Sequence, residues 1–365
     1  MRVLSENPAS VDAEDALHRR SRSDTCRVRV HGSAQTFDVR RNDLLLLSAL
    51  EQGIAYPHNC RVGTCGSCKT RLLDGRISPM VDFALSPLSN QELQDGYILA
   101  CQAKVRSDLV VDVAFGDRAR HLPRTLSARV IDWKRLPGEV VDLRLSLDEP
   151  LPFEAGQYCS LAVTGSFVRR SFSFYDAPPA VGSRGAREVG FLIKRLPGGQ
   201  FSEWLFAENR GGTKIWLEGP FGQMGVAADE RDGVCIAGGT GLAPILSIVA
   251  DRLARTRHAR FTIVFGARDA GSLFAMDRLQ QLQAAAPKRV TVLPILSHEA
   301  IGSAWQGRRG LVTAALDATL GIDFAATAAF VCGSLPMVEA VEARLAMLGV
   351  PRERIHADKF LPTGF

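Results

Sequence analysis

No stretch of this 365-residue sequence approaches the ~20 consecutive apolar residues that a membrane-spanning helix requires. Its start, Met1 to Glu6, lacks the apolar core of a secretory signal peptide. The formal net charge of +5 is small for this size and argues against nucleic acid as a partner. Internal repeats and low-complexity segments are also missing. These absences predict a cytoplasmic globular protein that binds neither membrane nor nucleic acid, and we expect a monomer.

Cysteine is the residue type whose arrangement says most about the chemistry. Four of the eight cysteines follow the spacing C-x4-C-x2-C with a distant fourth, which is the ligand spacing of a plant-type [2Fe–2S] cluster. A tight loop can present three thiolates to two bridged irons, and Gly63 and Gly66 let that loop turn closely with its N–H groups toward the sulfurs. The fourth thiolate must come from elsewhere, here from the end of an apolar run. The predicted ligands are Cys60, Cys65, Cys68 and Cys101.

A zinc site and disulfide bonds are the alternatives for these cysteines. Zinc ribbons usually pair two C-x2-C knuckles, and this sequence has one such pair. The other cysteines are scattered and lie mostly in apolar runs, which favours buried reduced thiols over disulfides. A Rieske centre would replace two cysteines with histidines, so His58 beside the loop is not needed as a ligand. A plant-type cluster carries one electron at a low potential, about −400 mV.

The pattern of predicted elements divides the chain into an N-terminal tail and three domains, which makes the fold class multidomain α+β and α/β. Residues 1–24 are expected to form a disordered tail. Residues 25–117 predict two strands, a helix over 43–52 capped by Asp43 and stopped by Gly53, the cysteine loop and a further strand. This is the order of elements in a β-grasp ferredoxin domain.

Two further domains are predicted after a linker over residues 118–125. Residues 126–227 hold short alternating runs separated by Gly and Pro, which is typical of a closed antiparallel β-barrel. In residues 228–365 buried strands alternate with helices, and this alternation predicts an α/β domain with a parallel sheet.

The barrel region contains a motif, Arg169 to Phe174, that points to a flavin. It resembles the Arg-x-aromatic-Ser motif of the ferredoxin–NADP⁺ reductase superfamily, with Phe172 where that family usually has Tyr. A guanidinium matches a pyrophosphate bidentately, and an aromatic ring stacks on the flavin. Taken alone, the run also fits a strand with a surface arginine. The resemblance assigns cofactor contacts to Arg170, Ser171, Phe172 and Ser173, with Ser173 as the catalytic hydroxyl beside the flavin's reactive nitrogen.

The segment 196–202 resembles the second flavin-phosphate loop of the same superfamily. Two glycines there expose backbone N–H groups just before a helix that begins near Ser202, which is a natural site for an anion. Taken alone, the segment is only a turn. The predicted cofactor contacts of this loop are Gly198, Gly199, Gln200, Phe201 and Ser202.

A glycine-rich turn and a strand-end cysteine predict the nicotinamide nucleotide site. The turn follows a buried strand, opens a helix and reads G-x-G-x-x-P, with the proline in the first helical turn, where a missing N–H costs little. The resemblance also places the Cys332 thiol near the nicotinamide carbon that gives up hydride, although without that context a buried strand cysteine would be favoured. The predicted contacts are Gly239, Thr240, Gly241, Pro244, Cys332 and Gly333.

Two further predictions concern cofactor choice and the flavin face. Arg268 can pair with a 2′-phosphate and Asp269 can accept a ribose hydroxyl. Because relatives with a Gly-Ala-Arg turn include NADH users, NADH is favoured, with NADPH as the alternative. In some relatives a terminal aromatic covers the flavin, a position that Phe365 or Phe360 would take here.

The sequence after residue 25 resembles as a whole the one-polypeptide reductases of bacterial ring-hydroxylating oxygenases, of the kind that serve benzoate and related dioxygenases. This domain order implies FAD as the flavin. The resemblance implies that NAD(P)H reduces FAD and that the [2Fe–2S] cluster passes single electrons to a terminal oxygenase, with a Rieske-type aromatic dioxygenase expected. A diiron monooxygenase and a sugar-dehydratase intermediate are alternative acceptors. A redox sensor that holds the cluster without turnover is the non-enzymatic alternative.

Overall fold

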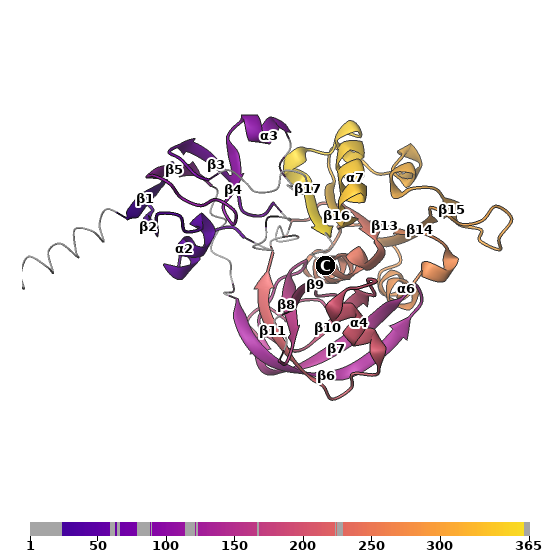
Figure 1. The fold of residues 1–365 in the computed structure, drawn as a ribbon. Helices are drawn as coiled ribbons and strands as arrows, with labels where there is room; N and C mark the ends of the chain where they lie inside the picture. The colour runs from indigo at the N-terminus through magenta and orange to yellow at the C-terminus, as the bar shows by residue number, and fades with distance from the viewer. Residues whose placement is uncertain are drawn as a thin grey trace, which may run out of the picture. The chain divides into compact units, whose positions relative to one another are not determined.

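The computed structural model describes residues 24–58, 63, 66–78, 88, 90–113, 121, 123–165, 168–222, 224 and 229–360. The chain divides into two compact units, residues 1–120 and 121–365 (Figure 1). Apart from Asp24, the predicted disordered tail lies outside the described residues. In the part of the chain that the structure describes, no helix combines the length and the apolar character that crossing a bilayer requires.

The first unit is built on one five-stranded sheet. Its elements are β1 (Thr25–Val30), β2 (Thr36–Arg40), α2 (Leu45–Glu51), β3 (Lys69–Asp74), α3 (Asn90–Gln94), β4 (Tyr97–Leu99) and β5 (Leu109–Asp112). The strand order is β2-β1-β5-β3-β4, and β1 pairs antiparallel with β2 and parallel with β5. Alternate residues of β1, among them Val28, share one core with Leu45 and Ala49 of α2. The predicted β-grasp arrangement is confirmed.

The predicted cap of α2 is wrong. The N-cap is Leu44, one residue after Asp43, and no side chain caps the helix. The first N–H groups of the helix are satisfied from another segment instead: Leu45 N donates to the carbonyl of Ala103 at 2.9 Å. Leu44 itself forms a bridge with Lys104. Backbone pairing with the 103–105 segment therefore replaces the side-chain cap that the sequence indicates.

The barrel of the second unit is a six-stranded antiparallel sheet. Its elements are β6 (Arg124–Leu136), β7 (Val140–Leu151), β8 (Tyr158–Val163), β9 (Arg169–Ser173), β10 (Ala186–Lys194), α4 (Gln200–Ala207) and β11 (Lys214–Phe221). The order is β10-β7-β6-β11-β8-β9, and the two end strands β9 and β10 contact each other, so the sheet curls round on itself. The predicted barrel is confirmed.

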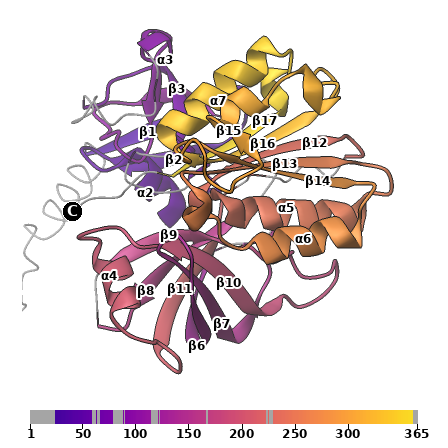
Figure 2. The ribbon, with the colours of Figure 1, turned by 90° about the vertical axis from the view of Figure 1, so that its right-hand side faces the viewer.

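The α/β part of the second unit has a parallel sheet in the order β15-β14-β13-β12-β16-β17. In Figure 2, α5 and α6 lie on one face of this sheet and α7 lies on the other. The predicted parallel sheet is confirmed. Its elements are β12 (Gly233–Gly238), η1 (Gly239–Gly241), α5 (Leu242–Arg255), β13 (Phe261–Ala267), η2 (Ala270–Ser272), α6 (Met276–Ala285), β14 (Val290–Leu296), β15 (Arg308–Arg309), η3 (Val312–Ala315), η4 (Ala318–Leu320), β16 (Ala328–Ser334), α7 (Leu335–Met347), η5 (Arg352–Arg354) and β17 (Ile355–Phe360).

The barrel and the α/β layer share one hydrophobic core. Val140, Ala155 and Leu192 of the barrel belong to the same buried cluster as Leu246 of α5 and Phe265 of β13. Because this cluster takes apolar surface from both layers out of water, sliding one layer over the other would expose it. The shared core therefore limits how the two layers move against each other.

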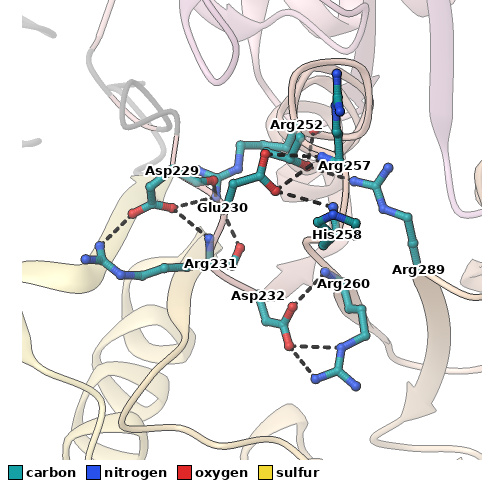
Figure 3. Close-up of polar contacts among 10 residues, drawn as sticks. Asp229, Glu230, Arg231, Asp232, Arg252, Arg257, His258, Arg260 and Arg289 are labelled. Atoms are coloured by element: carbon teal, nitrogen blue, oxygen red, sulfur yellow. Dashed lines mark hydrogen bonds and ion pairs between the residues drawn. The ribbon is translucent and has the colours of Figure 1, made fainter.

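A polar cluster closes the amino-terminal edge of the parallel sheet (Figure 3). Arg252, in the last turn of α5, is 1 % exposed, and its Nη2 donates to the Asp229 carboxylate at 2.8 Å and to the Asp229 carbonyl at 2.6 Å. Its guanidinium carbon lies 5.9 Å from the ring centroids of Phe261 and Phe330. Burial alone would raise the pKa of the Asp229 carboxyl, but hydrogen bonds and charge from Arg252 and Arg231 hold that pKa below its usual value. This ion pair ties the segment that enters the sheet to the end of α5.

Candidate functional site

Two of the four predicted cluster ligands lie in the described residues, and the structure brings them together. Cys68 precedes β3 and Cys101 follows β4, both are buried, and their sulfurs are 3.3 Å apart. Thiols that converge from two separate segments fit a cluster that takes its ligands from two sides. The other two predicted ligands, Cys60 and Cys65, lie outside the described residues.

The cysteine loop turns at the two predicted glycines. Gly63 and Gly66 have φ angles of +85° and +74°, in the region that favours glycine. A Cβ on Gly63 would also overlap the amide of Gln102, so the backbone there approaches a side chain closely. His58 is half-buried, and its Nδ1 lies 2.7 Å from the carbonyl oxygen of Tyr56. That hydrogen bond holds the imidazole to the backbone beside the loop.

The arginine motif lies on β9, at one end of the barrel's strand order. The alternation of a strand puts Arg170 and Phe172 on one face and Ser171 and Ser173 on the other. Ser173 is buried and pairs in register with Tyr158 of β8, whereas Ser171 is exposed. A ligand lying along the open side of this strand can therefore reach residues of both faces.

The two arginines of the motif have different surroundings. The exposed Arg169 forms an ion pair with Glu218 of β11. Arg170 is half-buried, and its Nη1 donates to the Arg169 carbonyl at 2.9 Å. Arg169 is thus held in an ion pair at the sheet surface, and Arg170 is the less exposed of the two arginines and lies on the same face of β9 as Phe172.

The second predicted flavin loop lies beside the arginine motif. The rings of Phe172 and Phe201 are 5.1 Å apart, which joins β9 to the first turn of α4. Gly199 is the N-cap of α4, and a Cβ there would lie 2.7 Å from the Ser202 hydroxyl. That hydroxyl donates to the carbonyls of Leu196 and Gly199, so Ser202 braces the loop. The helix begins at Gln200, which is exposed, and Gly198 has a φ of +74°.

The glycine turn and the strand-end cysteine meet at the carboxyl edge of the parallel sheet. The turn follows β12, Cys332 lies near the end of the neighbouring strand β16, and a Cβ on Gly241 would overlap the carbonyl of Cys332. Gly333 lies beside Met337, whose terminal methyl would be 2.7 Å from a Cβ at that position. Thr240 is in the middle of the η1 turn, and Pro244 is in the first turn of α5, as predicted. The glycine turn therefore packs closely against the end of β16, where a side chain at Gly241 would not fit.

Cys332 is a neutral thiol in this structure. The side chain is buried, and burial first and the nearby Asp358 carboxylate second raise the pKa of the thiol above its usual value, against a smaller effect of the Gly333 N–H. A thiol held protonated adds no charge to the edge where a nicotinamide ring is expected.

Arg268 and Asp269 follow β13, the strand beside β12. Arg268 is exposed, and its backbone carbonyl accepts a hydrogen bond from His298 N at 2.7 Å. One oxygen of Asp269 accepts from the Ser272 hydroxyl at 2.7 Å. Glu299 lies close by, since its carboxylate accepts from the Ala270 N–H at 2.7 Å. Two carboxylates therefore border this corner of the edge.

Of the two aromatic residues predicted to cover the flavin, one lies in the described residues. Phe360 is half-buried at the end of β17, pairs in register with Ser334, and packs against the core that the barrel and the α/β layer share. Phe365 lies outside the described residues. The backbone of Phe360 is thus fixed in the parallel sheet at the end of β17.

A group of polar residues near the site was missed by the sequence analysis. Tyr175, two residues after Ser173, donates from its hydroxyl to Asp142 at 2.8 Å, and Arg278 of α6 donates to the other oxygen of Asp142 at 2.6 Å. The one clue in the sequence is that Tyr175 directly follows the arginine motif of residues 169–174. The three residues come from distant parts of the sequence, and no spacing pattern links them.

Family models match the chain in three segments, in the order the sequence predicts. They are a 2Fe-2S iron-sulfur cluster binding domain over residues 28–106, an oxidoreductase FAD-binding domain over 127–225 and an oxidoreductase NAD-binding domain over 235–343. The cofactors of the chain are therefore a [2Fe–2S] cluster, FAD and a nicotinamide dinucleotide.

Curated relatives match over most of the chain. The xylene/toluene monooxygenase electron transfer component of Pseudomonas putida is 36% identical over 334 residues, which cover 91% of this chain and 93% of that protein. The reductase component of the naphthalene 1,2-dioxygenase system of Pseudomonas putida is 31% identical and covers 86% of this chain and 92% of its own length.

Solved structures show the same architecture. The cytochrome P450 reductase GcoB of Amycolatopsis aligns with a TM-score of 0.75 at 30% identity and covers 93% of this chain and 100% of its own. The ferredoxin reductase in carbazole 1,9a-dioxygenase aligns with a TM-score of 0.69 at 27% identity, over 92% of this chain and 98% of that one. This chain belongs to the family of iron–sulfur flavoprotein reductases that join a [2Fe–2S] ferredoxin domain to FAD- and NAD-binding oxidoreductase domains.

Proposed function

We propose that this reductase feeds electrons from NADH to a terminal oxygenase whose substrate is an aromatic compound. The observation that carries the proposal is the meeting of separate motifs in space: β9 contacts the 196–202 loop through Phe172 and Phe201, and Gly241 packs against Cys332. Both pairs lie in one compact unit, which suits a transfer of hydride between two bound cofactors.

The proposed domain boundaries follow the sequence pattern. Residues 25–117 hold the cluster, 118–125 form a linker whose last two residues already belong to β6, 126–227 hold FAD and 228–365 hold the nicotinamide nucleotide. The proposed cluster ligands are Cys60, Cys65, Cys68 and Cys101.

The proposed roles of the site residues follow from their chemistry. Arg170 and the N–H group at Gly198 bind the FAD phosphates, whereas the Gly199 N–H donates to the Leu196 carbonyl at 2.9 Å and is not available to a phosphate. Phe172 supplies a stacking ring without a hydroxyl, and Ser173 donates a hydrogen bond to the reactive nitrogen of the flavin. Cys332 presents an uncharged thiol to the nicotinamide. When bound, FAD converts a two-electron donor into a source of single electrons for the cluster.

NADH is the proposed donor because of the charges around the end of β13. The carboxylates of Asp269 and Glu299 border the corner where a ribose 2′ substituent is expected. Hydrogen bonds from Ser303 first and from the Ala270 N–H second lower the pKa of Glu299, so it is ionised at neutral pH. A 2′-phosphate would meet like charge there, whereas a 2′-hydroxyl can donate to a carboxylate.

Two classes of oxygenase are candidates for the acceptor. The resemblance of the sequence to reductases of ring-hydroxylating oxygenases favours a Rieske-type aromatic dioxygenase, and the similarity to the naphthalene 1,2-dioxygenase reductase supports it. A monooxygenase is the second candidate, because the xylene/toluene monooxygenase component has the higher identity, 36% against 31%. Both candidates share an aromatic substrate and differ in the protein surface that receives the electron.

The purified holoprotein is expected to reduce cytochrome c with NADH and to drive hydroxylation by an added aromatic oxygenase. We expect kcat/KM for NADH to exceed that for NADPH about tenfold, the ratio given by a discrimination of about 1.4 kcal/mol. In the Glu299→Gln variant this ratio should shrink, because one like charge is removed. Equal or better use of NADPH by the wild type would reject the NADH preference. Cytochrome c reduction without coupling to either oxygenase class would reject the proposed acceptor.

A further inference from the structure

Five polar residues join the barrel to helix α6, and we call them the α6 anchor: Asp142, Arg144, Tyr175, Asp176 and Arg278. The buried Asp142 is the centre, because one of its oxygens accepts from the Tyr175 hydroxyl at 2.8 Å and the other from Arg278 Nη2 at 2.6 Å. The guanidinium of Arg278 also stacks over the Tyr175 ring, 4.2 Å from its centroid. Arg278 is thus held by a charge-assisted hydrogen bond and by a flat ring at the same time.

The barrel side of the anchor is closely packed, and part of it follows the predicted flavin residues of β9 in the sequence. Tyr175 follows Ser173 by two positions, and its backbone N–H donates to the Gly190 carbonyl at 3.2 Å. A Cβ on Gly190 would overlap the Tyr175 ring, so the ring lies directly on the backbone of β10. Movement of Tyr175 would therefore move the end of β9 that carries Ser173.

Charge within the anchor is balanced. Arg144 donates to Asp176 at 3.2 Å, and the second oxygen of Asp176 accepts from the Gly190 N–H at 2.6 Å. Burial first and the Asp142 carboxylate second raise the pKa of Tyr175, so its hydroxyl stays protonated and remains a donor. Every charged group of the anchor thus has a partner of opposite sign.

The helix side of the anchor is continuous with the nicotinamide edge. The segment from η2 to α6 follows Arg268 and Asp269 at the end of β13. A second contact clamps the same segment to the barrel, because a Cβ on Gly138 of the β6–β7 turn would lie 3.1 Å from Ser272 of η2. Two points therefore hold this segment against the barrel.

We propose that Arg278 is a positioning residue, which sets the approach of the bound nicotinamide to the flavin by fixing α6 to Asp142 and Tyr175. This inference rests on the proposed flavin site at β9. Arg278 touches neither cofactor in this account. Its effect arises because a misplacement of about 1 Å between reacting groups can cost a rate about 100-fold.

The chain offers a closely matched control. Arg278 and Asp142 have side chains 31% and 11% exposed, and Arg255 and Asp251 have side chains 32% and 12% exposed, with N–O distances of 2.6 and 2.8 Å. The Arg255 pair lies within α5 and does not reach the barrel. Arg255→Leu therefore removes a similar ion pair and leaves the α6 anchor unchanged.

The test measures flavin reduction by stopped-flow absorbance in the holoproteins. In Arg278→Leu we expect the limiting rate at saturating NADH to fall about tenfold, with the apparent Kd for NADH within about twofold and FAD content unchanged, because the nucleotide edge itself is intact. The charge-transfer absorbance formed on mixing with NADH should weaken. Hydrogen exchange should quicken in residues 276–285 and stay unchanged in α7. Arg255→Leu should alter none of these, and Arg278→Lys should recover part of the rate.

Three outcomes would overturn the inference. A wild-type limiting rate in Arg278→Leu despite faster exchange in α6 would make the anchor merely structural. An equal loss of rate in Arg255→Leu would show a nonspecific effect. If Arg278→Leu gives too little folded protein to measure, the other two variants decide. A wild-type rate of flavin reduction in both Arg278→Lys and Tyr175→Phe would then reject the positioning role. Failure of the proposed function looks different, since the wild-type flavin would then not be reduced by NADH at all.

Discussion

Replacement of Cys101 by alanine is expected to abolish electron transfer beyond the flavin while leaving flavin chemistry intact. Cys101 is buried with its sulfur 3.3 Å from that of Cys68, and alanine offers no replacement ligand. Loss of an outer-shell partner typically costs about 10–100-fold in metal affinity or activity, so loss of a ligand should lower NADH–cytochrome c reduction at least about 100-fold. Reduction of ferricyanide, which accepts electrons from flavin, should stay near the wild-type rate.

Cys26→Ala is the matched control for this variant. Cys26 is 1 % exposed on β1, lies in the same core as Cys101, and is absent from the ligand motif. The control should keep the visible absorbance of the cluster and its cytochrome c activity. Full cluster absorbance and full activity in Cys101→Ala would contradict the assignment of Cys101 as the fourth ligand. Equal loss in both variants would indicate damage to the core.

Replacement of Arg252 by alanine is expected to destabilise the 121–365 unit by about 3 kcal/mol, the lower end of the range for breaking a buried ion pair. The change removes three hydrogen bonds, to the carboxylate and carbonyl of Asp229 and to the carbonyl of Arg231, and it leaves a cavity beside Phe261 and Phe330. Since each kcal/mol shifts Tm by about 2–4 °C in a domain of this size, the release of flavin on heating should occur about 6–12 °C earlier.

Arg260→Ala tests whether burial is the cause. Arg260 contacts Asp232 in the same cluster through Nε and Nη2, at 3.0 and 2.6 Å, but its side chain is 69% exposed (Figure 3). An exposed pair contributes about 0–1 kcal/mol, so this variant should unfold within a few degrees of the wild type. A shift in Arg260→Ala as large as in Arg252→Ala would contradict the account, as would an unchanged Tm in Arg252→Ala.

Regular elements were predictable where a buried face repeats along the chain. Strands such as β1, Thr25–Val30, could be predicted because buried and exposed residues alternate along the strand and apolar and polar residues alternate with them in the sequence. The cap of α2 was not predictable, because its first N–H groups, of Leu45 and Leu46, donate to the distant carbonyls of Ala103 and Ala100. β6, Arg124–Leu136, also begins inside the predicted linker 118–125, since its pairing with β11 includes the polar residues Arg124 and Thr125.

The features of the site also separate into those that could be predicted from the sequence and those that could not. Motifs written in consecutive residues, such as the β9 arginine motif and the glycine turn after β12, could be found from the sequence. The contact between Phe172 and Phe201 and the overlap that excludes a side chain at Gly241 depend on folding and could not. The α6 anchor is the extreme case, since Asp142 and Arg278 are 136 residues apart in the chain.

The central claim is that one chain takes hydride onto FAD and hands the electrons singly to its own cluster. The most direct measurement is rapid mixing of anaerobic holoprotein with NADH, followed by flavin absorbance and by the EPR signal of the reduced cluster. The account predicts one FAD and one [2Fe–2S] cluster per chain, with flavin bleaching first and the cluster signal appearing at a rate fast enough to support turnover. A cluster that stays oxidised while the flavin is reduced, or purified protein without flavin or iron, would contradict it.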